Sequence, residues 1–213
     1  GVVGLIVPWN FPMVIATWKL GPALATGNTV VLKPASLTPL TAIRLGELGL
    51  EAGLPPGVLN VVPGPGAKIG QQMSAHRDIA KIAFTGETET GRRIMATAAE
   101  TIKRVSLELG GKSPNVIFAD VDVAEAAKHA CASVFANAGQ DCCARARVIV
   151  ERKIYPALVE AMASVAKAMR VGDPLDDKTE MGPVISANQR ERTESYIALG
   201  QKEGARYVCG GER

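Results

Sequence analysis

Two adjacent cysteines, Cys142 and Cys143, stand in the segment NAGQDCCARAR (137–147), directly after a Gly-Gln pair. A cysteine becomes a nucleophile when positive charge, backbone N–H groups or a helix N-terminus stabilise its thiolate. The segment lies where a helix-forming run gives way to a strand, so its turn could present a thiol to a cleft. The stretch alone leaves two interpretations open: Cys142 is a nucleophile, or both cysteines are small core residues.

A metal site is the less favoured interpretation of these cysteines. His129 and Cys131 are two residues apart on a predicted helix and therefore point to different faces, so they cannot easily join Cys142 and Cys143 around one ion. Adjacent cysteines also lack the spacing of a zinc motif. We therefore expect no metal ligands in this chain.

Glu108 and Asn10 could take part in the same chemistry. Glu108 ends a predicted strand just before Gly110-Gly111, which permits a tight turn and a close approach of ligand to backbone. The carboxyl ends of parallel strands are where α/β folds place their sites. Asn10 lies between the prolines of PWNFP, in a stiff turn, and its amide could donate to an oxyanion. Taken singly, each residue is equally well explained as a surface charge or a turn residue.

The predicted elements around these residues alternate, as in βαβ units on a mostly parallel sheet. Helices are predicted over 38–53, with Thr38 as the cap and Pro39 in the first turn, and over 92–100, 122–136 and 154–170. The last of these has an apolar face that we assign to the core, made of Ile154, Leu158, Met162, Val165 and Met169. Strands are predicted from β-branched runs at 2–8, 28–34, 57–63, 79–86, 102–111, 113–119 and 146–151.

Composition narrows the class of protein. The 213 residues are 47% hydrophobic, enough for one large domain or two small ones. We place a boundary near Gly110-Gly111, between a nucleotide-cofactor-binding α/β domain (1–110) and the first part of a catalytic α/β domain (111–213). The chain opens in mid-strand and stops in a turn, so we expect a fragment that lacks the N-terminal part of the first domain and the C-terminal part of the second.

Charge and cysteine content exclude several partners. The net charge of +3 is mild and its bases are spread along the chain, which gives no reason to invoke nucleic acid or an anionic membrane. The four cysteines form no disulfide framework, and no apolar run approaches the ~20 residues of a membrane span. We expect a soluble, cytoplasmic protein.

Five motifs, taken together and in order, identify a family. They are PWNFP (8–12), LKPAS (32–36), FTGETETG (84–91), ELGGKSPN (108–115) and NAGQDCC (137–143). This set closely resembles the aldehyde dehydrogenase superfamily, over the whole chain. The resemblance implies an α/β fold with a Rossmann-like parallel-sheet cofactor domain, and oxidation of a small-molecule aldehyde to the carboxylic acid with NAD or NADP.

The resemblance also implies catalytic roles. Cys142 is the nucleophile, Glu108 the general base and Asn10 the oxyanion donor, assisted by the backbone N–H of Cys142. The thiolate attacks the aldehyde, a hydride leaves for the nicotinamide, and Glu108 activates the water that hydrolyses the thioester. Cys143 is expected to be a packing residue.

The cofactor contacts are likewise implied by the resemblance. Ile6 and Trp9 line the nucleotide cleft, and Lys33 bonds the adenosine ribose. The remaining contacts are Gly66 and Gly86 for the adenine and diphosphate, Leu109 for the nicotinamide end, and Gln189 for the nicotinamide ribose.

Two residues depart from the family pattern. Glu87 stands where serine is common, and its carboxylate would repel the diphosphate, so we expect it to turn outward and leave the binding to Thr88 or backbone amides. Ser36 stands where strict NAD-users often carry a glutamate that repels a 2′-phosphate. We therefore expect NADP to be tolerated, and the choice of NAD or NADP as the preferred coenzyme stays open.

Two other functions stay open. In the acylating branch of the superfamily, coenzyme A rather than water takes the acyl group. Enzymes of that branch have less need of a water-activating base, so the presence of Glu108 argues against it. An inactive binding or structural protein on the same fold is the second alternative. Members of the superfamily are more than twice this long, and we expect the full-length enzyme to be a homo-oligomer.

Overall fold

The computed structural model describes residues 1–211 and divides into two compact units, 1–110 and 111 onward. The division falls at the Gly110-Gly111 pair, where the sequence places the domain boundary. The roles assigned to the two domains stay predictions. Among the described residues, no helix combines the length and the apolar character needed to cross a bilayer.

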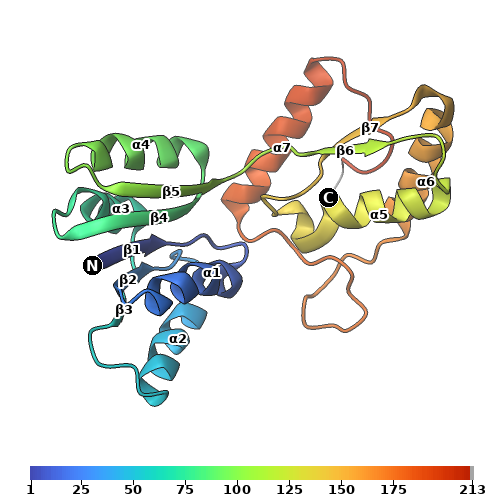
Figure 1. Ribbon diagram of the computed structural model, residues 1–213. Coiled ribbons are helices and arrows are strands. Elements are labelled where there is room, and N and C mark those ends of the chain that lie inside the picture. Colours follow the sequence, from blue (N-terminus) through green and yellow to red (C-terminus); the bar gives the residue numbers. More distant parts are fainter. Residues whose placement is uncertain (212–213) are drawn as a thin grey trace. The chain divides into compact units, whose positions relative to one another are not determined.

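The first unit is built on one parallel sheet with the strand order β3-β2-β1-β4-β5 (Figure 1). Each neighbouring pair runs parallel. The chain moves outward from β1 to β3 and then returns to the other side of β1, so the switch point of the topology lies between β1 and β4. The strands are β1 (Val2–Ile6), β2 (Thr29–Lys33), β3 (Leu59–Val61), β4 (Ile79–Gly86) and β5 (Arg104–Leu109).

Helices cover both faces of this sheet, and the α/β fold expected from the sequence is confirmed. On β1, Val3 and Leu5 are buried in a cluster with Leu20, whereas Ile6 belongs to the opposite cluster with Phe84. Because both faces of the sheet are buried, nearly every residue along the central strands is apolar. The first cluster packs under α1 (Pro12–Ala25) and α2 (Leu40–Glu51), the second under α3 (Gly66–Ala75) and α4 (Thr88–Ala99).

Three features of the first unit differ from the sequence prediction, namely the start of α2 and the presence of α1 and α3, two helices that the sequence did not predict. Helix α2 begins at Leu40 rather than at Thr38, and its N-cap, Pro39, makes no side-chain cap hydrogen bond. Pro39 already has helical dihedral angles, and a missing N–H costs nothing at a helix start. Helix α1 was not predicted at all. Its exposed side carries Met13 and Trp18, which hides the apolar periodicity expected of a surface helix.

The second unit contains a two-stranded parallel sheet, β6 (Pro114–Ile117) and β7 (Arg147–Val150). Leu158 is fully buried against Ile117, and Ile154 and Met162 pack around them, which confirms these members of the predicted apolar face. The helices are α5 (Val123–Phe135), α6 (Tyr155–Ala168) and α7 (Ala187–Lys202), with short 3-10 segments at Ala136–Gly139 and Arg152–Ile154.

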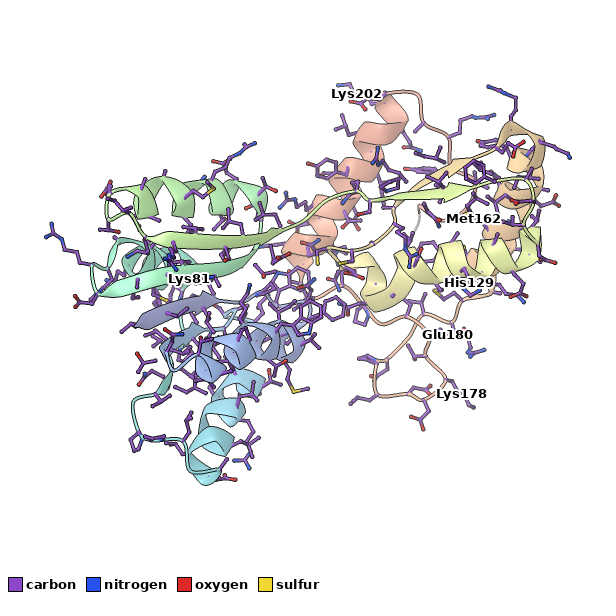
Figure 2. All side chains as sticks on the ribbon, in the orientation of Figure 1. Lys81, His129, Met162, Lys178, Glu180 and Lys202 are labelled. Carbon is purple, nitrogen blue, oxygen red and sulfur yellow. The ribbon has the colours of Figure 1, made fainter. Side chains whose placement is uncertain are left out.

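The loop between α6 and α7 is ordered by its own contacts. A bridge joins Val171 to Met181, and the Arg170 side chain donates to the backbone oxygen of Lys178 (2.7 Å) and pairs with Glu180 (3.5 Å). The part of the loop that carries Lys178 and Glu180 projects from the rest of its unit (Figure 2). Helix α7, which follows this loop, was not predicted from the sequence.

Candidate active site

Four of the predicted cofactor residues occupy equivalent places in the first unit. Ile6, Lys33, Gly86 and Leu109 are the last residues of β1, β2, β4 and β5, respectively. The carboxyl ends of parallel strands meet at one edge of a sheet, and ligands of open α/β folds bind there, at the switch point. The structure therefore brings these four positions to the edge where a nucleotide site is expected.

Lys33 and Ser36 lie beside the loop that leads into α3. Lys33 is buried, which lowers the pKa of its ammonium group, and its Nζ donates to the Pro34 backbone oxygen at 2.6 Å. A methyl group at Gly66, the first residue of α3, would lie 3.9 Å from that Nζ. The Ser36 hydroxyl donates to the Gly64 backbone oxygen at 2.9 Å. Lys33 and Ser36, the residues predicted at the ribose, thus both lie next to the loop that follows β3.

Two glycines, one at the end of β4 and one inside α4, lie close to neighbouring side chains. A Cβ at Gly86 would lie 2.5 Å from the Phe84 ring, and one at Gly91 would lie 2.9 Å from the Leu109 side chain. Glu87 is the N-cap of α4, is exposed and makes no side-chain cap hydrogen bond. The start of α4 is therefore held close to the sheet with its first N–H groups uncapped by a side chain, which suits an anion.

Trp9 and Asn10 follow β1 directly, at the carboxyl edge of the sheet. Both are half-buried, and α1 begins two residues later at Pro12. The proline at the first helical turn and the short connection leave the backbone of Asn10 little freedom. The backbone that carries this side-chain amide is thus restrained next to the strand ends, which suits an oxyanion donor.

Glu108 is exposed near the end of β5 and is paired in register with Thr85 of β4. Thr85 has a buried hydroxyl with no hydrogen-bond partner among the described residues. Burial lowers the pKa of Lys19 on α1, while the charge of Glu108 acts to raise it and Lys81 acts to lower it. Lys19 is therefore within electrostatic reach of the predicted base.

Sequence reasoning missed Lys19 and Thr85. A lysine in the middle of a helix is ordinarily solvent-exposed, and a threonine is common in a strand, so neither residue type signals a site. The one available signal for Lys19 is its position between two apolar residues, Trp18 and Leu20.

A left-handed turn precedes the predicted nucleophile in the second unit. Asn137, Ala138 and Gly139 have positive φ angles of 51°, 55° and 73°. A left-handed alanine costs roughly 1–2 kcal/mol, so the surrounding contacts must hold it in place. The backbone and the side chain of Gln140 both donate to the Asn137 backbone oxygen, each at 3.1 Å. This turn sets the direction in which the chain reaches Cys142.

Gln140 also joins this turn to a distant part of the second unit. Its side-chain oxygen accepts a hydrogen bond from the Ile185 N–H at 2.9 Å. The next residue, Ser186, caps α7 by accepting from the N–H of Gln189 at 3.2 Å. Gln140 thus links the loop that carries Cys142 to the segment that carries Gln189, the residue predicted at the nicotinamide ribose. The sequence alone did not predict this role of Gln140.

The surroundings of Cys142 raise the pKa of its thiol. Burial is the largest cause, followed by the hydrogen bond and charge of Cys143 and the charge of Asp141, while the Cys142 backbone N–H acts in the opposite direction. Of the features that would stabilise a thiolate, the structure supplies the backbone N–H of Cys142. The other surroundings favour the protonated thiol, so we expect a base to assist formation of the thiolate. Cys143 is exposed, and the two sulfur atoms are 3.8 Å apart.

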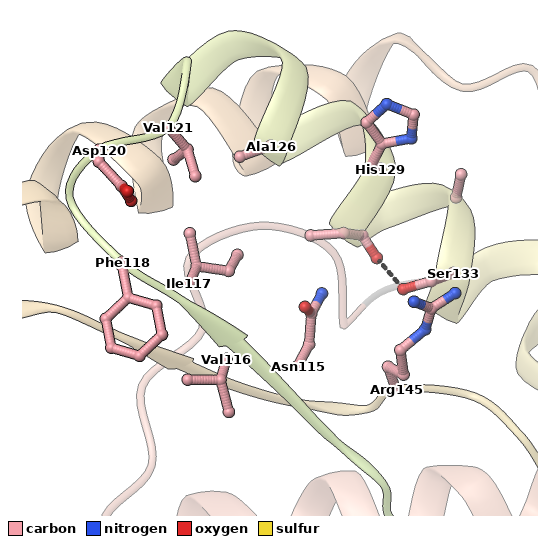
Figure 3. A pocket seen from close by; sticks show the side chains of 12 residues that line it. Asn115, Val116, Ile117, Phe118, Asp120, Val121, Ala126, His129, Ser133 and Arg145 are labelled. Atoms are coloured by element: carbon pink, nitrogen blue, oxygen red, sulfur yellow. Dashed lines mark hydrogen bonds between the residues drawn. The ribbon is translucent and has the colours of Figure 1, made fainter.

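A pocket of about 570 Å³ lies in the second unit, lined by β6, α5 and Arg145 (Figure 3). Asn115 lines it from β6, Phe118 from the residue just after β6, and His129 and Ser133 from α5. The Ser133 hydroxyl is already used, since it donates to the Ala130 backbone oxygen at 2.8 Å. None of the predicted site residues lines this pocket.

Known proteins with similar sequences agree with the doubly wound sheet and the cysteine loop described above. The Aldehyde dehydrogenase family matches residues 1–213, and the chain belongs to this family. The mitochondrial aldehyde dehydrogenase of Homo sapiens is 50% identical over 212 residues, which are 99% of this chain and 41% of that protein. The mitochondrial aldehyde dehydrogenase of Leishmania tarentolae is 51% identical over 214 residues, covering 100% of this chain and 43% of that protein.

Solved structures agree with these relatives. An NAD+ complex of the aldehyde dehydrogenase from Bacillus cereus superposes with a TM-score of 0.98 at 51% identity, covering 100% of this chain and 43% of that one. The chain thus spans less than half the length of the relatives that it matches.

Proposed function

We propose that this chain is part of an enzyme that oxidises an aldehyde to the carboxylic acid with NAD. The observation that carries the proposal is the placement of Ile6, Lys33, Gly86 and Leu109 at the carboxyl ends of four neighbouring parallel strands. Membership of the family, and a relative at 51% identity whose structure is an NAD+ complex, support it.

The residues at this edge fit a dinucleotide. The Lys33 ammonium group has three N–H donors. One donates to the Pro34 backbone oxygen, and the other two can donate to ribose hydroxyls. The starts of α3 and α4 offer backbone N–H groups to the diphosphate, and Gly86 lets it approach closely. A bound nicotinamide supplies a hydride acceptor, and the rest of the chemistry belongs to protein groups.

The finer coenzyme proposal concerns NADP. Ser36 is exposed and its hydroxyl is bonded to the Gly64 backbone, so it presents no negative charge to a 2′-phosphate. We expect the enzyme to use NADP as well as NAD for this reason.

The proposed catalytic steps use one residue from each of three segments. Glu108 takes the proton of Cys142, directly or through a water molecule, and the resulting thiolate attacks the aldehyde carbon, while Asn10 and the Cys142 backbone N–H donate to the oxyanion. After the substrate carbon has lost its hydride, Cys142 holds the acyl group as a thioester. Glu108 then removes a proton from the water that releases the acid.

The test uses the full-length enzyme with a panel of aldehydes and both coenzymes, and measures reduced coenzyme and acid product. We expect acid formation with NAD and a smaller, measurable rate with NADP, without any need for coenzyme A. Turnover that requires coenzyme A would assign the acylating branch instead, and a folded enzyme without turnover on any aldehyde would refute the proposal. A homo-oligomer and a cytoplasmic location stay predictions.

A further inference from the structure

The loop after Gln140 collects three potential metal ligands. One ligand atom from each of Asp141, Cys142 and Cys143 lies within 4.8 Å of the others. The two sulfur atoms are 3.8 Å apart. Two thiolates that bind one tetrahedral zinc ion at 2.3 Å are separated by roughly 3.8 Å, because the tetrahedral angle fixes that distance. The thiols therefore already stand at the spacing of a zinc–thiolate pair.

We propose that Asp141, Cys142 and Cys143 form a binding site for a thiophilic divalent cation such as Zn²⁺ or Cd²⁺, and that the bound cation inhibits the enzyme by occupying the Cys142 sulfur. The catalytic steps proposed above need no metal, so the cation acts only as an inhibitor. The binding is independent of the proposed function, whereas the inhibition rests on it.

Asp141 is placed to serve as the third ligand. Its Oδ1 accepts the N–H of Cys143 at 2.8 Å, which fixes the carboxylate on the same turn as the thiols. An ionised carboxylate has about four acceptor positions, so this hydrogen bond leaves others for a cation. Three protein ligands leave a fourth position for water, the arrangement of zinc sites that exchange ligands.

The site is open to solvent and needs no change in oxidation state. Cys143 is exposed, and Asp141 and Cys142 are half-buried. Binding replaces the two thiol protons by the cation, so one M²⁺ enters, two S–M bonds form and two protons are released. Nothing is oxidised or reduced, and a chelator reverses the reaction.

The site explains what a second, exposed cysteine beside the nucleophile can do. A single thiol would bind such a cation weakly, whereas two thiols at this spacing chelate it. Cys143 is therefore expected to be dispensable for turnover and necessary for tight inhibition.

The experiment titrates the full-length, chelator-treated enzyme with Cd²⁺ and follows the ultraviolet charge-transfer band of cadmium–thiolate bonds together with aldehyde turnover. We expect one Cd²⁺ per chain and inhibition that tracks the band. Cys143→Ser should keep most of the turnover and bind Cd²⁺ at least about 100-fold more weakly, and Asp141→Asn about 10-fold more weakly. Cys131→Ser, which removes a buried thiol outside the cluster, should behave like the parent.

Three results would overturn the proposal: no cadmium–thiolate band in the parent, the same Cd²⁺ affinity in Cys143→Ser as in the parent, or a band lost in Cys131→Ser. A parent enzyme that shows the band but turns over no aldehyde would refute the proposed function and leave the cation site standing. The two ideas therefore fail in distinguishable ways. Zn²⁺ should compete with Cd²⁺ in the same titration, since both prefer this ligand set.

Discussion

Gln140→Met removes the polar groups of Gln140 and keeps the length of its side chain. The parent side chain accepts from the Ile185 N–H at 2.9 Å and donates to the Asn137 backbone oxygen at 3.1 Å. Each such hydrogen bond contributes roughly 1 kcal/mol net, and stranding a half-buried N–H adds to the loss. The native arrangement of the loop should therefore be destabilised by about 2–3 kcal/mol, which is a factor of about 30–150 in the equilibrium constant between the native and the opened loop.

Two measurements on the full-length enzyme check this value. Amide hydrogen exchange at Ile185 should become about 30- to 150-fold faster, because that amide loses the Gln140 side-chain oxygen as its acceptor. The kcat/KM for aldehyde should fall by about 10- to 100-fold, because Cys142 is no longer held in one position. Thermal unfolding of the first unit should not change.

A matched variant separates the two hydrogen bonds. Gln140→Glu keeps an oxygen acceptor for Ile185 and loses the donor to Asn137, so exchange at Ile185 should remain close to that of the parent. Parental exchange at Ile185 in Gln140→Met would show that this hydrogen bond does not restrain the segment. Faster exchange with kcat/KM within twofold of the parent would show that the restraint does not position Cys142.

The remaining predictions also concern the full-length enzyme. Cys142→Ala should abolish turnover while Cys143→Ala keeps most of it, and acid formation at near-parental rate by the first variant would rule out the assigned nucleophile. Because Cys143 helps to raise the pKa of Cys142, Cys143→Ala should shift the pH dependence of Cys142 alkylation to lower pH; an unchanged midpoint would contradict this coupling. Ser36→Glu should shift the ratio of kcat/KM for NAD over NADP by at least about fivefold, and a change within about twofold would place Ser36 away from the ribose. In rapid mixing at a pH high enough to ionise Cys142 without a base, Glu108→Gln should keep a burst of reduced coenzyme and stall as an acyl adduct, whereas Asn10→Ala should slow the burst itself by roughly 10²–10³-fold; the reverse pattern would exchange their roles.

The strand ends of the first unit could be predicted from the sequence because two signals coincide there. β-branched runs mark the strands, and each run stops at a glycine, a proline or a charged residue, as at Lys33 and Gly86. The start of α2 was misplaced because Thr38 is a good cap by residue type, but Pro39 supplies the helical backbone angle on its own. Local residue preferences decide such ends only to within a residue or two.

The contacts that position the site could not be predicted in the same way. Gln140 and Ile185 are 45 residues apart, and no local pattern connects them. The left-handed Ala138 goes against residue preference and is held by its surroundings. The burial of Lys19 depends on how α1 packs on the sheet. These features arise from the tertiary fold, which overrides local preference at functional sites.

The small sheet of the second unit has a consequence for how the chain assembles. Among the described residues, β6 and β7 pair only with each other, so each has one edge of unpaired backbone groups. Val116 and Ile149, on these two strands, are largely exposed. An isolated strand pair is marginal in water, and an open apolar edge recruits strands from other molecules. The chain spans 41% of the length of its human relative, so we expect strands from the rest of the full-length enzyme to pair with the open edges of β6 and β7 and to stabilise this small sheet.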